Sequence, residues 1–330
     1  MDLDARIYVA GHRGLVGSAL VRVLKAAGYC NLLLRTRAEL DLTNARATAA
    51  FFEAEKPAYV FLAAARVGGI LANQSLPADF IRDNLLIQTH VLHEAWRNRV
   101  ERLLFLGSSC IYPRNAPQPM REQDLLTGAL EATNRPYALA KIAGIEMCWS
   151  LNRQHGTRFL AAMPTNLYGP EDNFDLQTSH VIPALLRKFH EARVAGAPSV
   201  TVWGSGNPRR EFMHSDDMAR ACVFLMQLDA PRFAGLLGTD ETQTGRFDPP
   251  LVNIGVGKDL TIAQLAETIA RVTGFEGEIV FDRSKPDGTP RKLMNVNRLG
   301  MLGFKPAMEL EEGLQSVYHK VFNAEAAIVP

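Results

Sequence analysis

The chain has 330 residues, of which 47% are hydrophobic and 22% are charged, and this is enough apolar material for one large or two modest cores. Its 36 basic and 35 acidic residues give a formal charge of +1, so nothing in the overall charge attracts nucleic acid or an anionic membrane. We therefore expect neither of these partners, and we expect any phosphate binding to be local.

No two of the four cysteines form a Cys-x-x-Cys pair, and four cysteines in 330 residues are too few for a disulfide scaffold. This usage predicts reduced thiols, and we expect no metal site. The N-terminal residues lack the basic start and long apolar stretch of a signal peptide, and no apolar run approaches the roughly 18 residues of a membrane span. Together these features predict a cytoplasmic protein.

Short β-rich runs alternate with helical patterns through the first half of the chain. The runs lie at 7–10, 32–34, 59–62, 103–106 and 159–162, and the helical patterns lie near 15–27, 45–55, 80–98 and 138–155. This alternation predicts an α/β fold, in which a doubly wound parallel sheet of the Rossmann type is covered by helices on both faces.

After Met163-Pro164 the alternation loosens, and turn-rich stretches are separated by helical patterns near 181–195 and 216–228. We expect residues 1–170 to form a nucleotide-binding Rossmann domain, with a return segment near 210–255. The remainder of 171–330 is expected to form a smaller mixed α/β substrate-binding domain. The segment 235–250 is rich in Gly, Thr, Asp and Pro, which predicts a mobile surface loop.

Three glycines, Gly11, Gly14 and Gly17, follow the first β-rich run and open the first helical pattern. A dinucleotide pyrophosphate would lie there against free N–H groups and the positive end of the helix dipole. The spacing is G-x-x-G-x-x-G rather than G-x-G-x-x-G, and turn chemistry alone can also place three glycines at a strand end. The strand before and the helix after favour a dinucleotide site.

The second β-rich run ends with Arg35 and Arg37, where an NAD-selective fold places an acidic residue about 20 positions after the glycines. Together with Arg13 in the glycine loop, these arginines could hold a 2′-phosphate through charge-assisted hydrogen bonds. The pattern favours NADP over NAD. The alternative is that both are solvated surface arginines.

Tyr137 and Lys141 are four residues apart, so on a helix both point from one face. An ammonium near a phenol favours the phenolate, although such a pair often arises by chance. Ser108 follows the apolar run 103–106, and ligands of parallel sheets bind outside the carboxyl ends of strands. A hydroxyl there could bind a substrate carbonyl while Tyr137 moves its proton, which predicts one reacting centre.

Four further segments occur in order: Gly-Ser-Ser-Cys-Ile-Tyr-Pro at 107–113, Met-Pro-Thr-Asn-Leu-Tyr-Gly-Pro at 163–170, Arg-Glu-Phe-Met-His at 210–214 and Lys-Pro-Asp-Gly-Thr-Pro-Arg-Lys at 285–292. With the features above, they resemble the extended short-chain dehydrogenase/reductase family of nucleotide-sugar enzymes, and within it the GDP-L-fucose synthases. The resemblance covers essentially the whole chain. It implies a homodimer that uses NADPH to convert GDP-4-keto-6-deoxy-D-mannose to GDP-L-fucose, by epimerisation at C3 and C5 and reduction at C4.

The resemblance also implies the roles of the reacting residues. Cys110 would be the base and His180 the acid of epimerisation, while Tyr137 would protonate the C4 oxygen. Ser108 would orient that carbonyl, and Lys141 would lower the pKa of the tyrosine and hold the nicotinamide ribose. The residues alone would not single out Cys110 or His180, because a lone cysteine after a buried strand is usually a core residue and a histidine opening a helix is more often a cap or surface group.

Ser109 is chemically equal to Ser108. We prefer Ser108 because it stands four residues before Tyr112, as in the family, and because Ser109 would face the other way in an extended segment.

The cofactor contacts that the resemblance implies are Gly11, His12, Arg13, Gly14, Leu15, Val16, Gly17, Leu106, Gly107, Ser108, Ser109, Lys141, Pro164, Thr165, Asn166, Leu167 and His180. For the GDP-sugar, it implies that Lys188 and Arg210 pair with the diphosphate, that Trp203 packs against the ligand and that Asp287 contacts the guanosine ribose. The ordinary alternatives are a solvated helix lysine, a core tryptophan and a structural ion-pair arginine.

Three other functions stay open at this point. A GDP-colitose synthase would use the same pocket for a 3-deoxy substrate and would need epimerisation only at C5. A nucleotide-sugar epimerase would return the hydride without net reduction, which the arginines at 35 and 37 disfavour. A non-catalytic NADP sensor would have no reason to keep Ser108, Tyr137 and Lys141 together.

Overall fold

The computed structural model describes residues 1–176, 178–239, 248–285 and 287–323. Part of the loop predicted at 235–250, namely 240–247, lies outside the described residues.

The centre of the molecule is a six-stranded sheet in the order β10-β5-β4-β3-β1-β2, and every neighbouring pair is parallel. All residues of β1, β3 and β10 are buried, as expected for strands covered on both faces. The strands are β1 (Ile7–Ala10), β2 (Leu32–Leu33), β3 (Tyr59–Leu62), β4 (Arg102–Leu106), β5 (Phe159–Pro164) and β10 (Leu251–Ile254).

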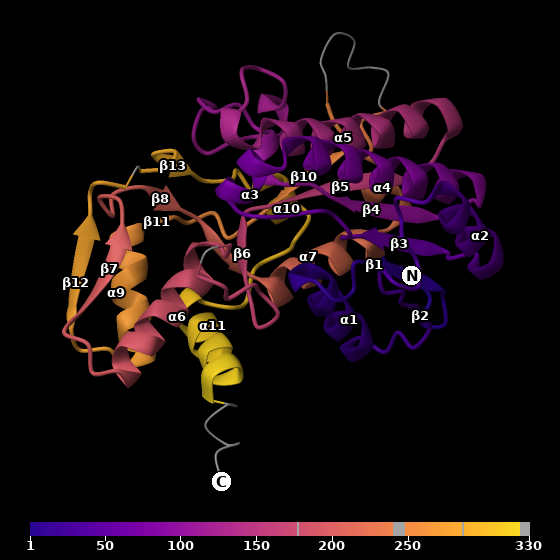
Figure 1. Cartoon of the computed structure of the whole chain (residues 1–330). Helices are drawn as coiled ribbons and strands as arrows, with labels where there is room; N and C mark the ends of the chain where they lie inside the picture. The colour runs from indigo at the N-terminus through magenta and orange to yellow at the C-terminus, as the bar shows by residue number, and fades with distance from the viewer. Residues whose placement is uncertain (177, 240–247, 286, 324–330) are drawn as a thin grey trace.

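Helices cover both faces of this sheet (Figure 1). Above the sheet in that view lie α4 and α5, next to α2, and below it lie α1 and α7; each layer packs its own hydrophobic core against the strands. Their bounds are α1 (Leu15–Ala26), α2 (Ala45–Glu55), α4 (Pro77–Arg97), α5 (Arg135–His155) and α7 (Ser215–Gln227). The predicted Rossmann-type fold is confirmed. Among the described helices, none combines the length and apolarity that crossing a bilayer would require.

The sheet gains its last strand from far along the chain. β10 pairs with β5 in the register Leu251↔Ala161 to Ile254↔Pro164. This pairing brings the residues that follow Ile254 to the carboxyl end of β5, the edge at which parallel sheets bind ligands.

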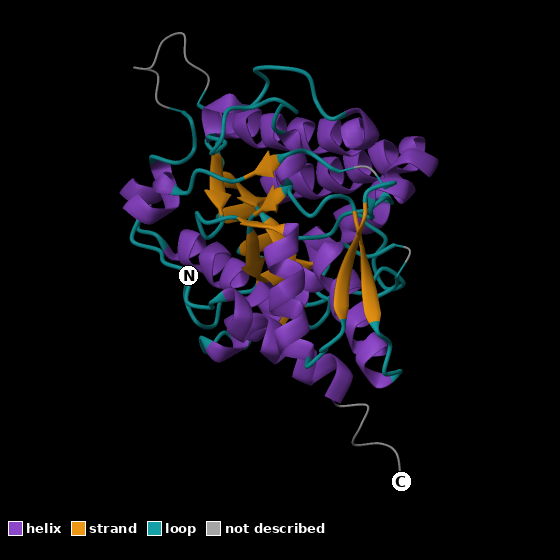
Figure 2. Ribbon diagram, turned by 90° about the vertical axis from the view of Figure 1, so that its left-hand side faces the viewer, coloured by secondary structure: helices purple, strands orange, loops and turns teal. Residues whose placement is uncertain are grey.

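A third hydrophobic core lies in the C-terminal half, where helices pack on a ribbon of two parallel strands. Figure 2 shows this ribbon beside the central sheet rather than as its continuation. The elements are α6 (Val181–Val194), α9 (Ile262–Thr273), α11 (Leu310–Tyr318), β7 (Ser199–Trp203) and β12 (Glu278–Asp282). The division of the chain into two domains at residue 170 stays a prediction.

Short strands connect the two regions. The pairs are β6 with β9, and β8 with both β11 and β13. The bounds of these strands and of the remaining short helices are β6 (Asn166–Tyr168), β8 (Arg209–Arg210), β9 (Phe212–His214), β11 (Leu260–Thr261), β13 (Arg291–Lys292), α3 (Ile70–Ser75), α8 (Ala230–Ala234) and α10 (Asn297–Met301).

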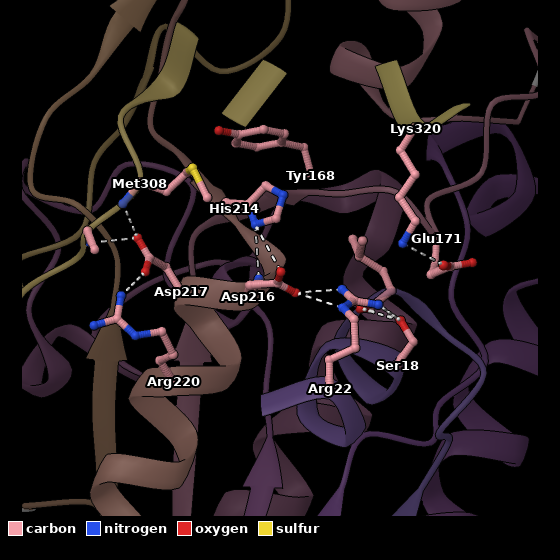
Figure 3. A network of polar contacts seen from close by, with 12 residues as sticks. Ser18, Arg22, Tyr168, Glu171, His214, Asp216, Asp217, Arg220, Met308 and Lys320 are labelled. Atoms are coloured by element: carbon pink, nitrogen blue, oxygen red, sulfur yellow. Dashed lines mark hydrogen bonds and ion pairs between the residues drawn. The ribbon is translucent and has the colours of Figure 1, made fainter. Parts of the chain in front are cut away.

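Two adjacent carboxylates at the start of α7 make contrasting contacts (Figure 3). The Asp217 carboxylate is buried and accepts hydrogen bonds from the backbone N–H groups of Ala307 and Met308, both at 2.8 Å. It also pairs with Arg220 at 2.6 Å. Asp216 pairs instead with Arg22 on α1 at 2.5 Å, at a half-exposed site. Helix α7 is thereby joined to α1 on one side and to the C-terminal region on the other.

Candidate active site

The glycine loop has the close approaches that a dinucleotide requires. Gly11 has a φ of +83°, and a Cβ there would lie 2.7 Å from the backbone nitrogen of Ala64. A Cβ on Gly17 would lie 2.0 Å from the Gly11 carbonyl oxygen, so a larger residue at either position would displace backbone. These contacts explain why the loop carries glycine where strand β1 turns into helix α1.

The N-terminus of α1 is free to bind an anion. Helix α1 follows Gly14, which offers no capping side chain, and the first turn contains no acidic residue. Its first N–H groups and the positive end of its dipole are therefore available to a pyrophosphate. In the same loop the Nδ1 atom of His12 is buried with no hydrogen-bond partner in the structure. The loop fits a dinucleotide cofactor.

The two arginines after β2 differ in how firmly they are held. Arg35 forms an ion pair with Glu55 at 2.5 Å and lies 5.6 Å from the centre of the Phe51 ring. Arg37 is 76% exposed, and its ion pair with Asp41 is long at 3.9 Å. Arg37 is therefore the freer of the two to turn toward a 2′-phosphate.

Ser108 stands at the centre of the reacting group. It has an extended backbone two residues beyond the end of β4, and its hydroxyl lowers the pKa of both the Tyr137 phenol and the Cys110 thiol. The expectation of an extended segment through Ser109 is wrong, because Ser109–Ile111 form a 3-10 turn. The turn buries the Ser109 hydroxyl, which accepts a hydrogen bond from Lys292 Nζ at 3.5 Å.

The lysine of the predicted pair does not act on Tyr137 as expected. Lys141 Nζ donates to the Leu106 carbonyl oxygen at 2.7 Å and lies 5.8 Å from the centre of the Tyr137 ring. Burial lowers the pKa of Lys141 to about 8. Burial, and then the Cys110 charge, raise the pKa of Tyr137 well above its usual value, so the phenol keeps its proton at neutral pH.

Cys110 and His180 share an electrostatic neighbour. Burial raises the pKa of the Cys110 thiol, while the Lys292 ammonium, the Ser108 hydrogen bond and the Lys141 ammonium lower it. His180 precedes α6, and its side chain caps no helix N–H. Desolvation, and then Lys292, lower the pKa of the imidazole, which favours a neutral ring at neutral pH.

The side chains predicted for the GDP-sugar lie on the C-terminal side. Trp203 ends β7 and is 64% exposed, so it is not a core residue. Two ammonium groups flank its ring, Lys188 at 5.1 Å and Lys285 at 5.6 Å from the ring centre. The arrangement offers an aromatic face beside positive charge, which suits a nucleotide.

The other two predicted substrate residues have internal partners. Arg210 donates to the carbonyl oxygens of Arg209 and Thr289 at 2.8 and 2.5 Å, and burial lowers its pKa. The Asp287 carboxylate accepts hydrogen bonds from the backbone N–H and the hydroxyl of Ser205 at 2.8 and 2.6 Å. Asp287 thus orders the turn after Trp203, and its predicted contact with a ribose stays a prediction.

The family model of the NAD dependent epimerase/dehydratase family matches residues 7–233. The chain belongs to this family. It is 55% identical over 317 residues to GDP-L-fucose synthase 1 of Arabidopsis thaliana, covering 96% of this chain and 93% of that protein. It is also 55% identical to the GDP-L-fucose synthase of Escherichia coli, with 95% of each chain covered.

Two further similarities bear on the site. MlghC, a GDP-mannoheptose C4 reductase of Campylobacter jejuni solved with NADP bound, is 40% identical, with a TM-score of 0.85 and 97% and 99% of the two chains covered. A GDP-L-colitose synthase of Yersinia pseudotuberculosis is 34% identical, with 96% and 98% covered. The identity to the colitose enzyme is thus well below the identity to the two fucose synthases.

Two residues near this site, Lys292 and Glu211, were not predicted from the sequence. The Glu211 side chain is fully buried and accepts hydrogen bonds from the N–H groups of Val256, Gly257 and Met294 at 2.7, 2.6 and 3.0 Å. Both residues lie inside segments that carried the family resemblance, at 210–214 and 285–292. The available signal was a charged side chain in each segment: the glutamate that precedes the apolar residues of 210–214, and the lysine that ends the turn-rich 285–292.

Proposed function

We propose that the protein is an NADPH-dependent epimerase-reductase that converts GDP-4-keto-6-deoxy-D-mannose to GDP-L-fucose. The observation that carries this proposal is the electrostatic coupling of three buried-site groups: the Cys110 charge raises the pKa of the Tyr137 phenol, and Ser108 lowers the pKa of both groups. A simple carbonyl reductase needs the phenol but no thiol. The 55% identity to two GDP-L-fucose synthases supports the same substrate.

The cofactor would lie along the edge formed by β1, β4 and β5. The N-terminus of α1 would hold the diphosphate, and Arg37, with Arg13 and Arg35 nearby, would hold the 2′-phosphate. When bound, NADPH supplies the hydride that reduces C4. The buried Lys141 would lie against the nicotinamide ribose, where its ammonium can donate hydrogen bonds to hydroxyl groups.

Epimerisation would come first. The Cys110 thiolate removes the proton at C3 or C5, and the electron pair moves onto the C4 oxygen as an enolate. Ser108 and Tyr137 stabilise that oxygen by hydrogen bonds from the same side chains that bind the ketone. His180, after it takes up a proton from solvent, returns a proton to the opposite face of the carbon, which inverts its configuration.

Reduction follows in the same pocket. Tyr137 donates its proton to the C4 oxygen as hydride reaches C4. The raised pKa of the phenol means that its proton is present at neutral pH before the reaction begins.

Product analysis tests this function directly. Purified protein with NADPH and GDP-4-keto-6-deoxy-D-mannose should consume NADPH and yield GDP-L-fucose, identified by NMR. Conversion of only the 3-deoxy analogue would instead indicate a GDP-colitose synthase. Epimerised product without NADPH consumption would indicate an epimerase without net reduction.

Cys110→Ser separates the two chemistries. A hydroxyl is a far weaker base than a thiolate at neutral pH, so epimerisation should fall by roughly 10²- to 10⁴-fold. Slow reduction of the unepimerised ketone should persist, because Tyr137 and Ser108 are intact. Equal loss of both activities would remove Cys110 from the role of base.

We also propose that the protein is a homodimer that works in the cytoplasm. The similarity to GDP-L-fucose synthases supports these two statements. Light scattering on the purified protein measures the first, and fractionation of cells measures the second.

A further inference from the structure

Lys292 is delivered to the reacting centre by a strand that is anchored on two sides. β13 runs parallel to β8, with Lys292 opposite Arg210. The next residue, Leu293, accepts a hydrogen bond from the N–H of Met120 and donates one to the side chain of Gln118, both at 2.8 Å. The N–H of Met294 donates to Glu211 at 3.0 Å. Hydrogen bonds on both sides therefore hold the backbone of this lysine.

The side chain of Lys292 is largely withdrawn from water, and among the described residues it forms no ion pair with a carboxylate. Its Nζ atom reaches the Ser109 hydroxyl at 3.5 Å. Burial is the main cause that lowers its pKa. A desolvated ammonium without an anionic partner is unfavourable. A negative charge beside Lys292 would therefore stabilise the site.

Cys110 directly follows Ser109 in the chain, and among the described residues its thiolate is the anion that most favours protonated Lys292. Lys292 and the thiol act on each other electrostatically, and Lys292 lowers the pKa of the thiol more than the Ser108 hydrogen bond or the Lys141 ammonium does. The Cys110 charge also raises the pKa values of Tyr137 and Lys141.

Other charged groups face Lys292 from the elements packed around it. Arg210 on β8 opposes its protonation and Glu131 favours it, while Lys292 itself lowers the pKa of His180. None of these supplies an anion at hydrogen-bond distance within the described residues.

We propose that Lys292 is a positioning residue for epimerisation, whose ammonium pairs with the Cys110 thiolate and holds the catalytic base in its ionised form. On ionisation the thiol proton passes to solvent, and the thiolate then takes the proton from the substrate carbon. The pair of electrons from that C–H bond moves onto the C4 oxygen. The role rests on the proposed use of Cys110 as base, but the pairing of Lys292 with the thiolate does not require substrate.

The pairing can be measured without any substrate, by alkylation of the full-length protein with iodoacetamide across a range of pH. Cys30→Ser removes the exposed thiol, and Cys148 and Cys222 are fully buried, so the adduct on Cys110 can be followed by mass spectrometry. Lys292→Met should raise the apparent pKa of the thiol by about one unit and slow alkylation about tenfold at a fixed pH below that pKa. Lys292→Arg, which keeps the charge, should stay close to the parent protein.

The same substitution at an exposed lysine, Lys258→Met, is the matched control and should leave the alkylation profile unchanged. Thermal unfolding of each variant establishes that it is folded, and Lys292→Gln provides a second neutral variant if Lys292→Met does not fold. An alkylation profile of Lys292→Met that overlays the parent, or a shift of the same size in Lys258→Met, would overturn the proposal.

Two further measurements distinguish this proposal from a role of Lys292 in binding the diphosphate and from the proposed function itself. If Lys292→Met weakens binding of GDP while the thiol profile is unchanged, Lys292 serves the diphosphate and the pairing is wrong. Where the pairing holds, solvent deuterium should enter C3 and C5 about tenfold more slowly in Lys292→Met at fixed pH. If the thiol profile shifts but the protein makes no GDP-L-fucose, the pairing stands and the proposed function fails.

Discussion

The cofactor edge and the substrate side of this site are constructed differently. The cofactor edge comprises short continuous segments at the carboxyl ends of β1, β4 and β5, at 11–17, 106–109 and 164–167. On the substrate side, Arg210 and Lys292 meet through the pairing of two-residue strands that are about 80 positions apart. The first is part of a buried parallel sheet, and the second depends on a few polar contacts between distant segments.

This difference has an energetic consequence. The strands of the cofactor edge are covered by two hydrophobic cores, so that removing one polar group leaves the edge in place. The substrate side is held by single side chains such as Glu211 and Asp217, each of which accepts hydrogen bonds from backbone of another segment. We therefore expect the loss of a polar group at the cofactor edge to lower rates without lowering stability, and the loss of a joining carboxylate to lower stability.

The largest effect should come from Tyr137→Phe at the cofactor edge. Loss of the proton donor should slow reduction by on the order of 10³-fold, because general acid catalysis contributes about 10²–10⁴-fold. The helix and its packing are unchanged by removal of one hydroxyl, so the melting temperature should stay close to that of the parent. Single-turnover reduction measured by NADPH absorbance gives the rate.

The same variant should still exchange solvent deuterium into C3 and C5, because Cys110 and His180 are untouched, but more slowly than the parent, because Tyr137 also stabilises the enolate oxygen. Failure of both exchange and reduction would mean that the assignment of the acid is wrong. A large drop in melting temperature would contradict the separation of rate from stability at this edge.

The contrast also explains which parts could be predicted from the sequence. The strands and the residues Gly11, Ser108, Tyr137 and Lys141 follow from local patterns, because apolar runs, glycine turns and helical spacing act over a few residues. Lys292 could not be placed this way, since its proximity to Ser109 is created by a two-residue strand and by hydrogen bonds to distant backbone.

Two details at the reacting centre needed the structure for a different reason. The 3-10 turn at Ser109–Ile111 turns Ser109 toward Lys292, and no periodicity distinguishes such a turn from an extended segment over three residues. The pKa of Tyr137 depends on how completely the phenol is buried, which the spacing to Lys141 does not reveal. Both are products of tertiary packing.

The second largest effect is a gain in stability, from Lys141→Met. Burial lowers the pKa of Lys141 from 10.5 to about 8, so between those values the unfolded chain binds more protons than the folded one and stability rises with pH. Below about pH 8 the buried charge destabilises the fold by an upper bound of roughly 3 kcal/mol, at about 1.4 kcal/mol per pKa unit.

Lys141→Met should therefore be more stable than the parent at pH 7 while losing reductase activity. The difference should shrink as pH rises from about 8 toward 10, where the parent lysine is also neutral when folded. Denaturant unfolding at pH 7 and at the upper end of this window measures it. Equal stability of the two proteins at pH 7 would contradict the buried charge.

The third effect tests the join between the regions, through two neighbouring carboxylates (Figure 3). Asp217→Ala leaves the N–H groups of Ala307 and Met308 without their acceptor and should lower the free energy of unfolding by about 2 kcal/mol. Asp216→Ala removes a half-exposed ion pair with Arg22 and a 4.0 Å contact with the His214 ring, and it should cost less than about 1 kcal/mol. Urea unfolding measures both free energies of unfolding. If the two variants lose the same amount, the buried contacts of Asp217 contribute no more stability than the half-exposed ion pair of Asp216.

The smallest expected effect is on the preference for NADPH over NADH, and it tests Arg37. Arg37→Ala should raise the KM for NADPH about tenfold, as expected for loss of roughly 1.4 kcal/mol of charge-assisted binding, and should leave the KM for NADH nearly unchanged. Arg35→Ala is the matched comparison, because its guanidinium is paired with Glu55 and packed on Phe51. It should lower stability more and the preference for NADPH less than Arg37→Ala. If Arg35→Ala abolishes the preference instead, Arg35 must leave Glu55 when the cofactor binds, and the cofactor edge is less preorganised than the sheet beneath it.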